Sequence, residues 1–363
     1  MDKKSRRVVG IWLLIGVFMI FVQVLLGGIT RLTGSGLSIT QWDLIMGTLP
    51  PQNQQAWDHA FDLYRQTPQF KIMNSSMTLI SFKAIFFWEY LHRLWARLFI
   101  IVFVFPIVYF LFKKMISRQL LIKALIAFML GALQGLLGWI MVSSGLTDKP
   151  SVNAVDLSAH LVLALVLYCY LFWVALETIG QSVQDYQPPS LKKFSYLITG
   201  LLFVQIFYGG LMAGNHAALF YPTFPKFGDK WIPDGLFIHS PAAANLFSSV
   251  AMIQVIHRSL GLFIGLAIGS FYYACRKKRV HSSLMPGAIT MLILVVIQIT
   301  LGILTLWNSL GKIPVFTAEV HQIVALLLLT ASVYMNYCLS AKKFYIPLSS
   351  TKAKAFQVTN SNG

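Results

Sequence analysis

The stretch from Val250 to Ala274 reads VAMIQVIHRSLGLFIGLAIGSFYYA and carries a His–Arg pair near its start. A bilayer core requires about 20 consecutive apolar residues per helix, and this stretch supplies them. Ionisable side chains inside a membrane helix are costly and usually serve a function. The stretch therefore predicts both a membrane-spanning helix and a functional site near one end of it.

Seven further stretches have the same apolar character, so the sequence predicts eight spanning helices. The seven are residues 8–29, 88–112, 120–142, 156–178, 194–213, 285–306 and 318–340. Two long segments, 30–87 and 214–249, are rich in Pro, Gly, Trp and Asn, and we expect them to form ordered caps on one side of the membrane. The polar tail after residue 341 is expected to be disordered.

The composition excludes an ordinary soluble enzyme. Hydrophobic residues make up 56% of the chain, charged residues only 11%, and the mean hydropathy is +0.68. The net charge of +17 could suggest nucleic-acid binding. Most Lys and Arg, however, fall in the short connections on one side, which is the positive-inside pattern. The charge therefore indicates topology, with both termini cytoplasmic, and we expect no nucleic-acid partner.

Several short motifs occur twice at a near-constant spacing of 161 to 165 residues, which indicates a duplication. The pairs are Glu89-Tyr-Leu-His92-Arg93 and Gln254-Val-Ile-His257-Arg258, His160 and His321, and Gln134…Gly138 and Gln298…Gly302. Each half has an even number of helices, so the halves share one orientation, as in parallel repeats. We predict an all-α polytopic membrane protein whose eight transmembrane helices form two pseudo-twofold-related four-helix bundles, residues 1–180 and 181–341, followed by a cytoplasmic tail, 342–363.

The helix histidines are the strongest functional signal, because each half contributes two, all near the same membrane face. They are His92, His160, His257 and His321. Two imidazoles facing inward in a four-helix bundle are typical haem ligands. Interhelical hydrogen bonding would be the simpler interpretation of one such histidine, but four in a repeated pattern favour haem. Zinc or copper is disfavoured because no carboxylate or thiolate completes the set. The other four, expected to be solvated loop residues, are His59, His216, His239 and His281.

The two halves differ at one position beside a histidine. Glu89 lies three residues before His92, on the same helix face, where the second half has Gln254. A carboxyl there could exchange protons with a substrate, or pair with Arg93. Arg93 and Arg258 could bind haem propionates or extend to the membrane interface. We hypothesise that the first bundle performs chemistry and the second transfers electrons.

Longer blocks of sequence resemble the haem A synthase family across nearly the whole chain. They are Gly27–Trp42, Gly47–Pro51 with Trp57, Glu89–Arg97, Gly138–Leu146, and Tyr221–Pro225 with Trp231–Pro233. One branch of that family carries a cysteine pair in its outer loops. Here Cys169, Cys275 and Cys338 all fall in or at the inner ends of helices, so the sequence resembles the mitochondrial and Gram-negative-type branch.

The resemblance implies an oxidoreductase that converts haem O to haem A for terminal cytochrome oxidase. The C8 methyl group of haem O would be oxidised to a formyl group by successive hydroxylations. By motif position, His92 and His160 would flank the substrate haem and Glu89 would be catalytic. His257 and His321 would bind a permanent haem b, whose iron would pass electrons.

The resemblance also implies partners and a location. Haem O could be delivered by haem O synthase, and electrons would leave to an acceptor that the motifs do not identify. Membrane lipid surrounds the chain, and small-residue helix faces would permit a homo-oligomer. We expect a multi-pass protein of a bacterial inner membrane. The alternatives are a di-haem membrane cytochrome b that only transfers electrons, and a transporter using Glu89 and the histidines as proton relays.

Overall fold

The computed structural model describes residues 1–363 except 41–48, 148–149, 181–187, 279, 281–283 and 341–363. Eight helices in this described part are long and apolar enough to cross a membrane, as predicted. They are α1 (Lys3–Leu32), α4 (Leu79–Phe112), α5 (Arg118–Thr147), α6 (Ala154–Ile179), α7 (Pro189–Gly214), α9 (Val250–Lys277), α10 (Met285–Trp307) and α11 (Val315–Ser340). The protein is a multi-pass membrane protein, and its predicted tail lies outside the described residues.

Local sequence signals set several helix ends. The Asp2 carboxylate accepts a hydrogen bond of 2.7 Å from the Ser5 amide at the start of α1. Thr78 and Ser249 cap α4 and α9 in the same way, which satisfies amides that lack a partner within the helix. Helix α6 ends at Gly180, whose φ of 77° suits the left-handed conformation of a helix C-terminus.

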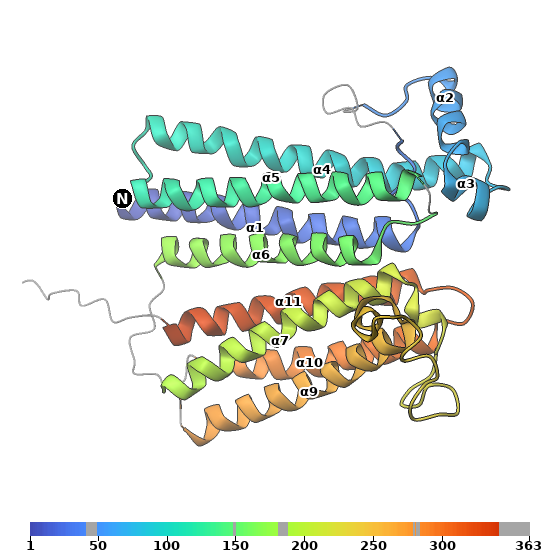
Figure 1. The fold of residues 1–363 in the computed structure, drawn as a ribbon. Coiled ribbons are helices and arrows are strands. Elements are labelled where there is room, and N and C mark those ends of the chain that lie inside the picture. The colour runs from blue at the N-terminus through green and yellow to red at the C-terminus, as the bar shows by residue number, and fades with distance from the viewer. Residues whose placement is uncertain (41–48, 148–149, 181–187, 279, 281–283, 341–363) are drawn as a thin grey trace, which may run out of the picture.

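The helices pack as two groups of four (Figure 1). Helices α1, α4, α5 and α6 form the first bundle, and α7, α9, α10 and α11 form the second. Contacts of α1 with α4 and α6, and of α5 with α6, recur as contacts of α7 with α9 and α11, and of α10 with α11. This recurrence is consistent with the predicted duplication.

Small residues join the two bundles where α6 meets α7. A Cβ atom on Gly214 would lie 2.5 Å from the Cβ of Ala154, and one on Gly210 would lie 2.9 Å from the Cα of Ser158. Close backbone approach through small residues is a typical association mode for membrane helices, because lipid offers little hydrophobic driving force. Helix α1 also contacts α11, so the bundles share one continuous core.

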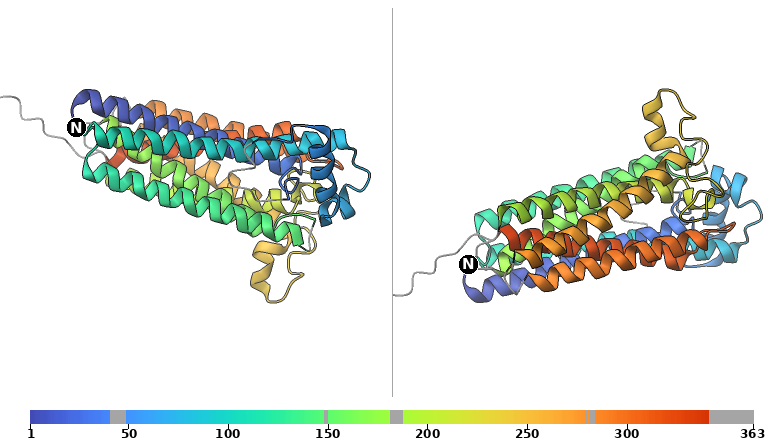
Figure 2. Two further views of the ribbon diagram at one scale, coloured as in Figure 1. Left: turned by 90° about the horizontal axis from the view of Figure 1, so that it is seen from above. Right: turned by 90° about the horizontal axis from the view of Figure 1, so that it is seen from below.

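Both views in Figure 2 show additional elements at one end of the bundles, which we call the cap end. It comprises α2 (Gln54–Arg65), α3 (Pro68–Met73) and the segment with η2 (Ala217–Leu219), η3 (Ala242–Ala244) and α8 (Asn245–Ser248). The described parts of both long segments are thus ordered, as expected.

Helix α4 begins nine residues before the predicted span, at Leu79. Its extra turns contain Ser81 and Lys83, which weaken the hydropathy signal. Phe82 and Phe86 on these turns pack against Phe61 and Tyr64 of α2. The added turns therefore hold the cap in place instead of lengthening the membrane span.

Candidate haem sites

The four helix histidines lie toward the cap end of α4, α6, α9 and α11, one per helix. The ring centroids of His257 and His321 are 6.5 Å apart, with planes inclined at 68°. Two metal–imidazole bonds of about 2 Å, with roughly 1 Å from each nitrogen to its ring centre, require about 6 Å. The second pair is therefore spaced to hold one metal ion between two rings. His92 and His160 lie toward the cap end of the first bundle, on α4 and α6.

A glycine on the preceding helix faces each histidine ring. A Cβ atom placed on Gly27 would lie 3.2 Å from Cε1 of His92, and one on Gly209 would lie 3.5 Å from Cε1 of His257. At Gly138 and Gly302 the corresponding distances to the facing Cε1 atoms are 3.0 and 2.9 Å. A side chain at any of these four glycines would contact the imidazole ring that the glycine faces.

A glutamine precedes each of these glycines by four residues, one helical turn away. The four are Gln23, Gln134, Gln205 and Gln298. The sequence analysis singled out Gln134 and Gln298 but missed Gln23 and Gln205. The missed signal is the Gln-x-x-x-Gly spacing itself, which occurs once in each of α1, α5, α7 and α10.

Each glutamine contacts the histidine that its glycine faces. Nε2 of Gln23 donates to the main-chain oxygen of His92 at 3.2 Å and lies 3.2 Å from Nδ1 of that ring. Nε2 of Gln205 makes the same contacts with His257, at 3.0 and 3.2 Å. In the first bundle, Gln134 donates 3.0 Å to the main-chain oxygen of His160.

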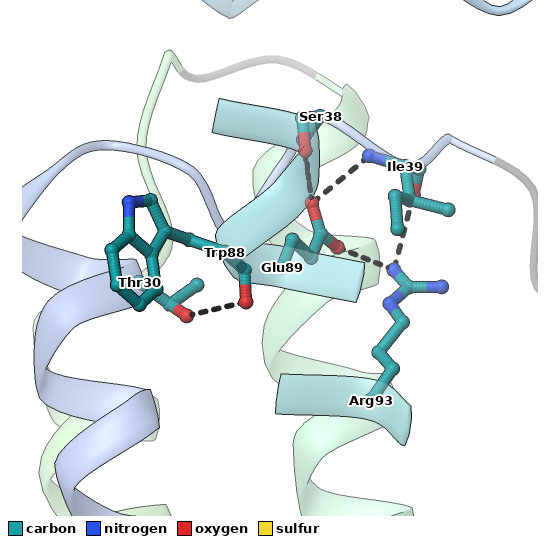
Figure 3. A network of polar contacts seen from close by, with 6 residues as sticks. All are labelled: Thr30, Ser38, Ile39, Trp88, Glu89 and Arg93. Carbon is teal, nitrogen blue, oxygen red and sulfur yellow. Dashed lines mark hydrogen bonds and ion pairs between the residues drawn. The ribbon is translucent and has the colours of Figure 1, made fainter. Parts of the chain in front are cut away.

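Glu89 is held by the chain that follows α1 (Figure 3). One carboxylate oxygen accepts hydrogen bonds from the amide and hydroxyl of Ser38, both at 2.7 Å, and from the Ile39 amide at 2.9 Å. The other oxygen pairs with Arg93 at 2.6 Å. The side chain of Glu89 is only 3% exposed, so this buried network fastens residues 38–39 to α4 about one turn from His92.

The second bundle builds the same arrangement without a negative charge. Gln254 bonds the main-chain oxygen of Ala217 and the guanidinium of Arg258. Arg258 also donates to the main-chain oxygens of Tyr221 at 2.7 Å and Thr223 at 2.9 Å. Its buried Nε atom has no hydrogen-bond partner among the described residues.

The bundles differ in how their second and third helices pack. In the second bundle α9 contacts α10 along its length, and Gly265 receives Ile299, whose Cδ1 would lie 3.0 Å from an added Cβ. In the first bundle α4 and α5 barely approach each other. The repeat spacing places Gly135 at the position of Ile299, and a Cβ there would meet nothing within 4 Å. The first bundle therefore has a loosely packed seam between α4 and α5.

One histidine expected to be solvated is partly buried. Nη2 of Arg31 lies 3.2 Å from Nε2 of His216 and donates to the main-chain oxygen of Ala213 at 2.6 Å, at the end of α7. Burial, with the nearby Arg31 charge, lowers the pKa of His216 to about 4. The solvation prediction was wrong for His216 because this interhelical contact is not visible along the chain. His59 and His239 are exposed, and His281 lies outside the described residues.

Comparison with known proteins identifies the family. A family model described as cytochrome oxidase assembly protein matches residues 10–333. The haem A synthase of Nitrosomonas eutropha is 42% identical over 336 residues, which cover 92% of this chain and 94% of that protein. The chain belongs to the haem A synthase family. The human haem A synthase COX15 is 40% identical over 343 residues, covering 92% of this chain and 83% of its own length.

The residues present fit the haem groups that haem A synthases imply. The described part of the chain contains no cluster of three or more His, Cys, Asp or Glu side chains that could hold a bare metal ion. A haem iron requires only two axial ligands from protein, and each bundle provides one pair of imidazoles. Beside each histidine lies a glutamine whose buried Oε1 atom has no hydrogen-bond partner among the described residues, which fits a site that takes up a further group.

Proposed function

We propose that this chain is an oxidoreductase that converts haem O to haem A by oxidising the C8 methyl group to a formyl group in successive hydroxylations. The single observation that carries the proposal is the paired set of histidines in an apolar membrane scaffold whose sequence is 42% identical to a haem A synthase. A substrate with a long hydrophobic tail partitions into lipid, which accounts for an enzyme made almost wholly of spanning helices.

The first bundle is proposed as the substrate site, with His92 and His160 as ligands of haem O. Two features support this assignment. The bundle carries the buried carboxylate of Glu89 where the second has an amide. Its seam between α4 and α5 is loosely packed, and Gly135 leaves space there. A membrane-dissolved substrate with a bulky tail needs such access from lipid.

The second bundle is proposed as the site of a permanent haem b, with His257 and His321 as its ligands. The 6.5 Å ring separation and the closed α9–α10 packing support a resident group held without exchange. When bound, haem b supplies single-electron transfer. The chain's own contribution is to hold the two imidazoles and to exclude water with apolar side chains.

Glu89 is proposed as the catalytic carboxylate of the first bundle. Its hydrogen bonds to Ser38 and Ile39 and its pair with Arg93 hold the carboxylate at the cap end of that bundle. From there it could accept or return a proton during oxidation. Arg93 and Arg258 are proposed as propionate partners, and the free Nε atom of Arg258 supports this role.

Haem extraction and chromatography test the proposal. Purified protein supplied with haem O should yield a formyl-bearing haem, and its absorption spectrum should show a haem with two histidine ligands. Glu89→Gln should bind both haems and form no haem A. Glu177→Gln is the matched control, because this carboxylate forms an exposed ion pair with Lys123 away from the histidines. Haem binding without conversion in the wild type would favour the electron-transferring cytochrome b instead.

The proposal extends to location and partners. A bacterial inner membrane with both termini cytoplasmic is supported by the Lys and Arg distribution. Delivery of haem O by haem O synthase and assembly into a homo-oligomer are proposed on the chemistry of the substrate and on the small-residue helix faces. Crosslinking in native membranes tests both associations.

A further inference from the structure

Residues 235–249, which lead into α9 and are called the side loop below, form an exposed stretch without a charged side chain. They read GLFIHSPAAANLFSS and include no Asp, Glu, Lys or Arg. Phe237, Ile238 and Phe247 are 71%, 64% and 42% exposed. Residues 241–243, a proline and two alanines, are exposed as well. A contiguous apolar surface of this kind usually marks contact with a partner or a membrane.

The main chain of the side loop is hydrogen-bonded from inside by Asn245, whose side chain is fully buried. Its Oδ1 atom accepts bonds from the amides of Ile238 and His239, both at 2.9 Å. Its Nδ2 atom donates to the main-chain oxygens of His239 at 2.8 Å and Ala242 at 3.0 Å. A carboxamide offers two acceptor and two donor positions, so Asn245 uses its full capacity. The loop is therefore ordered, with polar main-chain groups inside and apolar side chains outside.

This arrangement suits lipid better than water. Water can satisfy exposed main-chain groups, whereas the hydrocarbon of a bilayer cannot, so a segment that enters lipid pairs those groups internally. At the base of the loop, the hydroxyl of Ser249 adds a bond of 2.7 Å to the main-chain oxygen of Gly235. The exposed polar side chains of the loop are only His239, Ser240 and Ser248. These few polar groups suit the boundary between headgroups and acyl chains, where interfacial segments lie.

The side loop also lies at the level of the membrane surface. Figure 2 shows the gold segment with η3 and α8 projecting sideways from the bundles, near the cap ends of the spanning helices. Helix α9 follows directly and begins at Val250, where its predicted span begins. In the first bundle, α4 begins nine residues before its predicted span and meets α2 there. Helix α2 exposes Asp58, Asp62 and Arg65, as a water-facing cap should.

We propose that the side loop inserts into the lipid at the cap-end surface of the membrane and anchors the start of α9. Its partner is the bilayer itself, with Phe237 and Ile238 against acyl chains and the base of the loop among headgroups. The sideways projection favours lipid over a soluble protein, because the space beside the spanning helices is filled by the membrane. The inference is independent of the haem assignments, since it uses none of the paired histidines.

Spin-label accessibility in the full-length chain, reconstituted into phosphatidylcholine vesicles, tests the proposal. A nitroxide is attached at Phe237→Cys in a chain whose three cysteines are replaced by alanine. Phe105→Cys on α4 is the lipid control, because Phe105 is 70% exposed within a spanning helix. Asp62→Cys on α2 is the water control, because the Asp62 side chain is 63% exposed at the cap end. Oxygen concentrates among acyl chains and a neutral nickel chelate in water, so the ratio of their collision rates reports the surroundings.

The ratio of oxygen to nickel collisions at Phe237→Cys should exceed that at Asp62→Cys several-fold and approach that at Phe105→Cys. Ile238→Cys should give the same result, which excludes an effect peculiar to one side chain. A ratio equal to that of Asp62→Cys would place the loop in water and overturn the proposal. Loss of collisions with both reagents would show that protein covers the loop, and spin–spin broadening would identify a second copy of the chain; either result would also overturn it.

Discussion

Adding one methyl group to Gly302 should displace the proposed haem ligand His321, whereas the same change at Gly209 should not displace His257. The Cβ of Gly302→Ala would lie 2.9 Å from Cε1 of His321, and ordinary contacts begin at 3.4 Å, so the ring must move by about 0.5 Å. The Cβ of Gly209→Ala would lie 3.5 Å from Cε1 of His257, which is an ordinary contact.

The pair is well matched because both glycines lie in spanning helices and face ligands of the same proposed haem. Each substitution also gains about 1 kcal/mol of helix propensity, so a general loss of folding is not expected. Disturbing the orientation of a metal ligand typically costs about 10–100-fold in affinity. We therefore expect haem b to bind about tenfold more weakly in Gly302→Ala, and to remain within about twofold of the wild type in Gly209→Ala.

The assay measures haem b per protein after purification, and then its loss to excess apomyoglobin. Helix content from circular dichroism serves as the folding control. Equal haem loss in the two variants would show that the distance from Cβ to the ring does not govern binding. Full retention in Gly302→Ala would show that His321 does not hold haem in the position described.

Two further predictions concern the substrate seam and the acid sensitivity of the cap end. Gly135→Ile should fill the space between α4 and α5 and slow haem O conversion without changing the haem b content. Gly269→Ile is the control, because Gly269 lies on a helix of the second bundle with equal free space, and conversion should stay unchanged. Equal slowing in the two variants would refute access through the seam. The lowered pKa of His216, about 4 because of burial and the Arg31 charge, keeps the folded imidazole neutral. The unfolded chain, with an ordinary histidine pKa near 6.5, then binds more protons, so stability should fall as pH drops from about 6.5 to 4. His216→Asn, which tolerates the φ of 49° at this position, should flatten that loss in thermal unfolding, and an unchanged pH profile would contradict the assignment.

The sequence pattern predicted the positions of the helix histidines but only some of their neighbours. Hydropathy was enough to predict eight spanning helices, and the repeat spacing was enough to identify His257 as the equivalent of His92 and His321 as the equivalent of His160. Span length and residue period are properties of the chain itself. The partners of those histidines were only partly recognised. Gln23 and Gln205 are single polar residues in apolar helices, and only the packing of α1 on α4 and of α7 on α9 brings them to a histidine.

The sequence by itself determined the number of helices, their approximate ends and the chemistry available in each half, because these depend on local composition and on residue identity. The tertiary structure alone decided which polar groups meet: Ser38 and Ile39 on Glu89, Arg31 on His216, and an α4–α5 seam unlike its α9–α10 counterpart. These features depend on how each helix is rotated and how closely it approaches its neighbours. In an apolar environment the rotation and approach of the helices are set by side-chain shape and a few hydrogen bonds between helices. These depend on two or more segments together, so no single segment determines them.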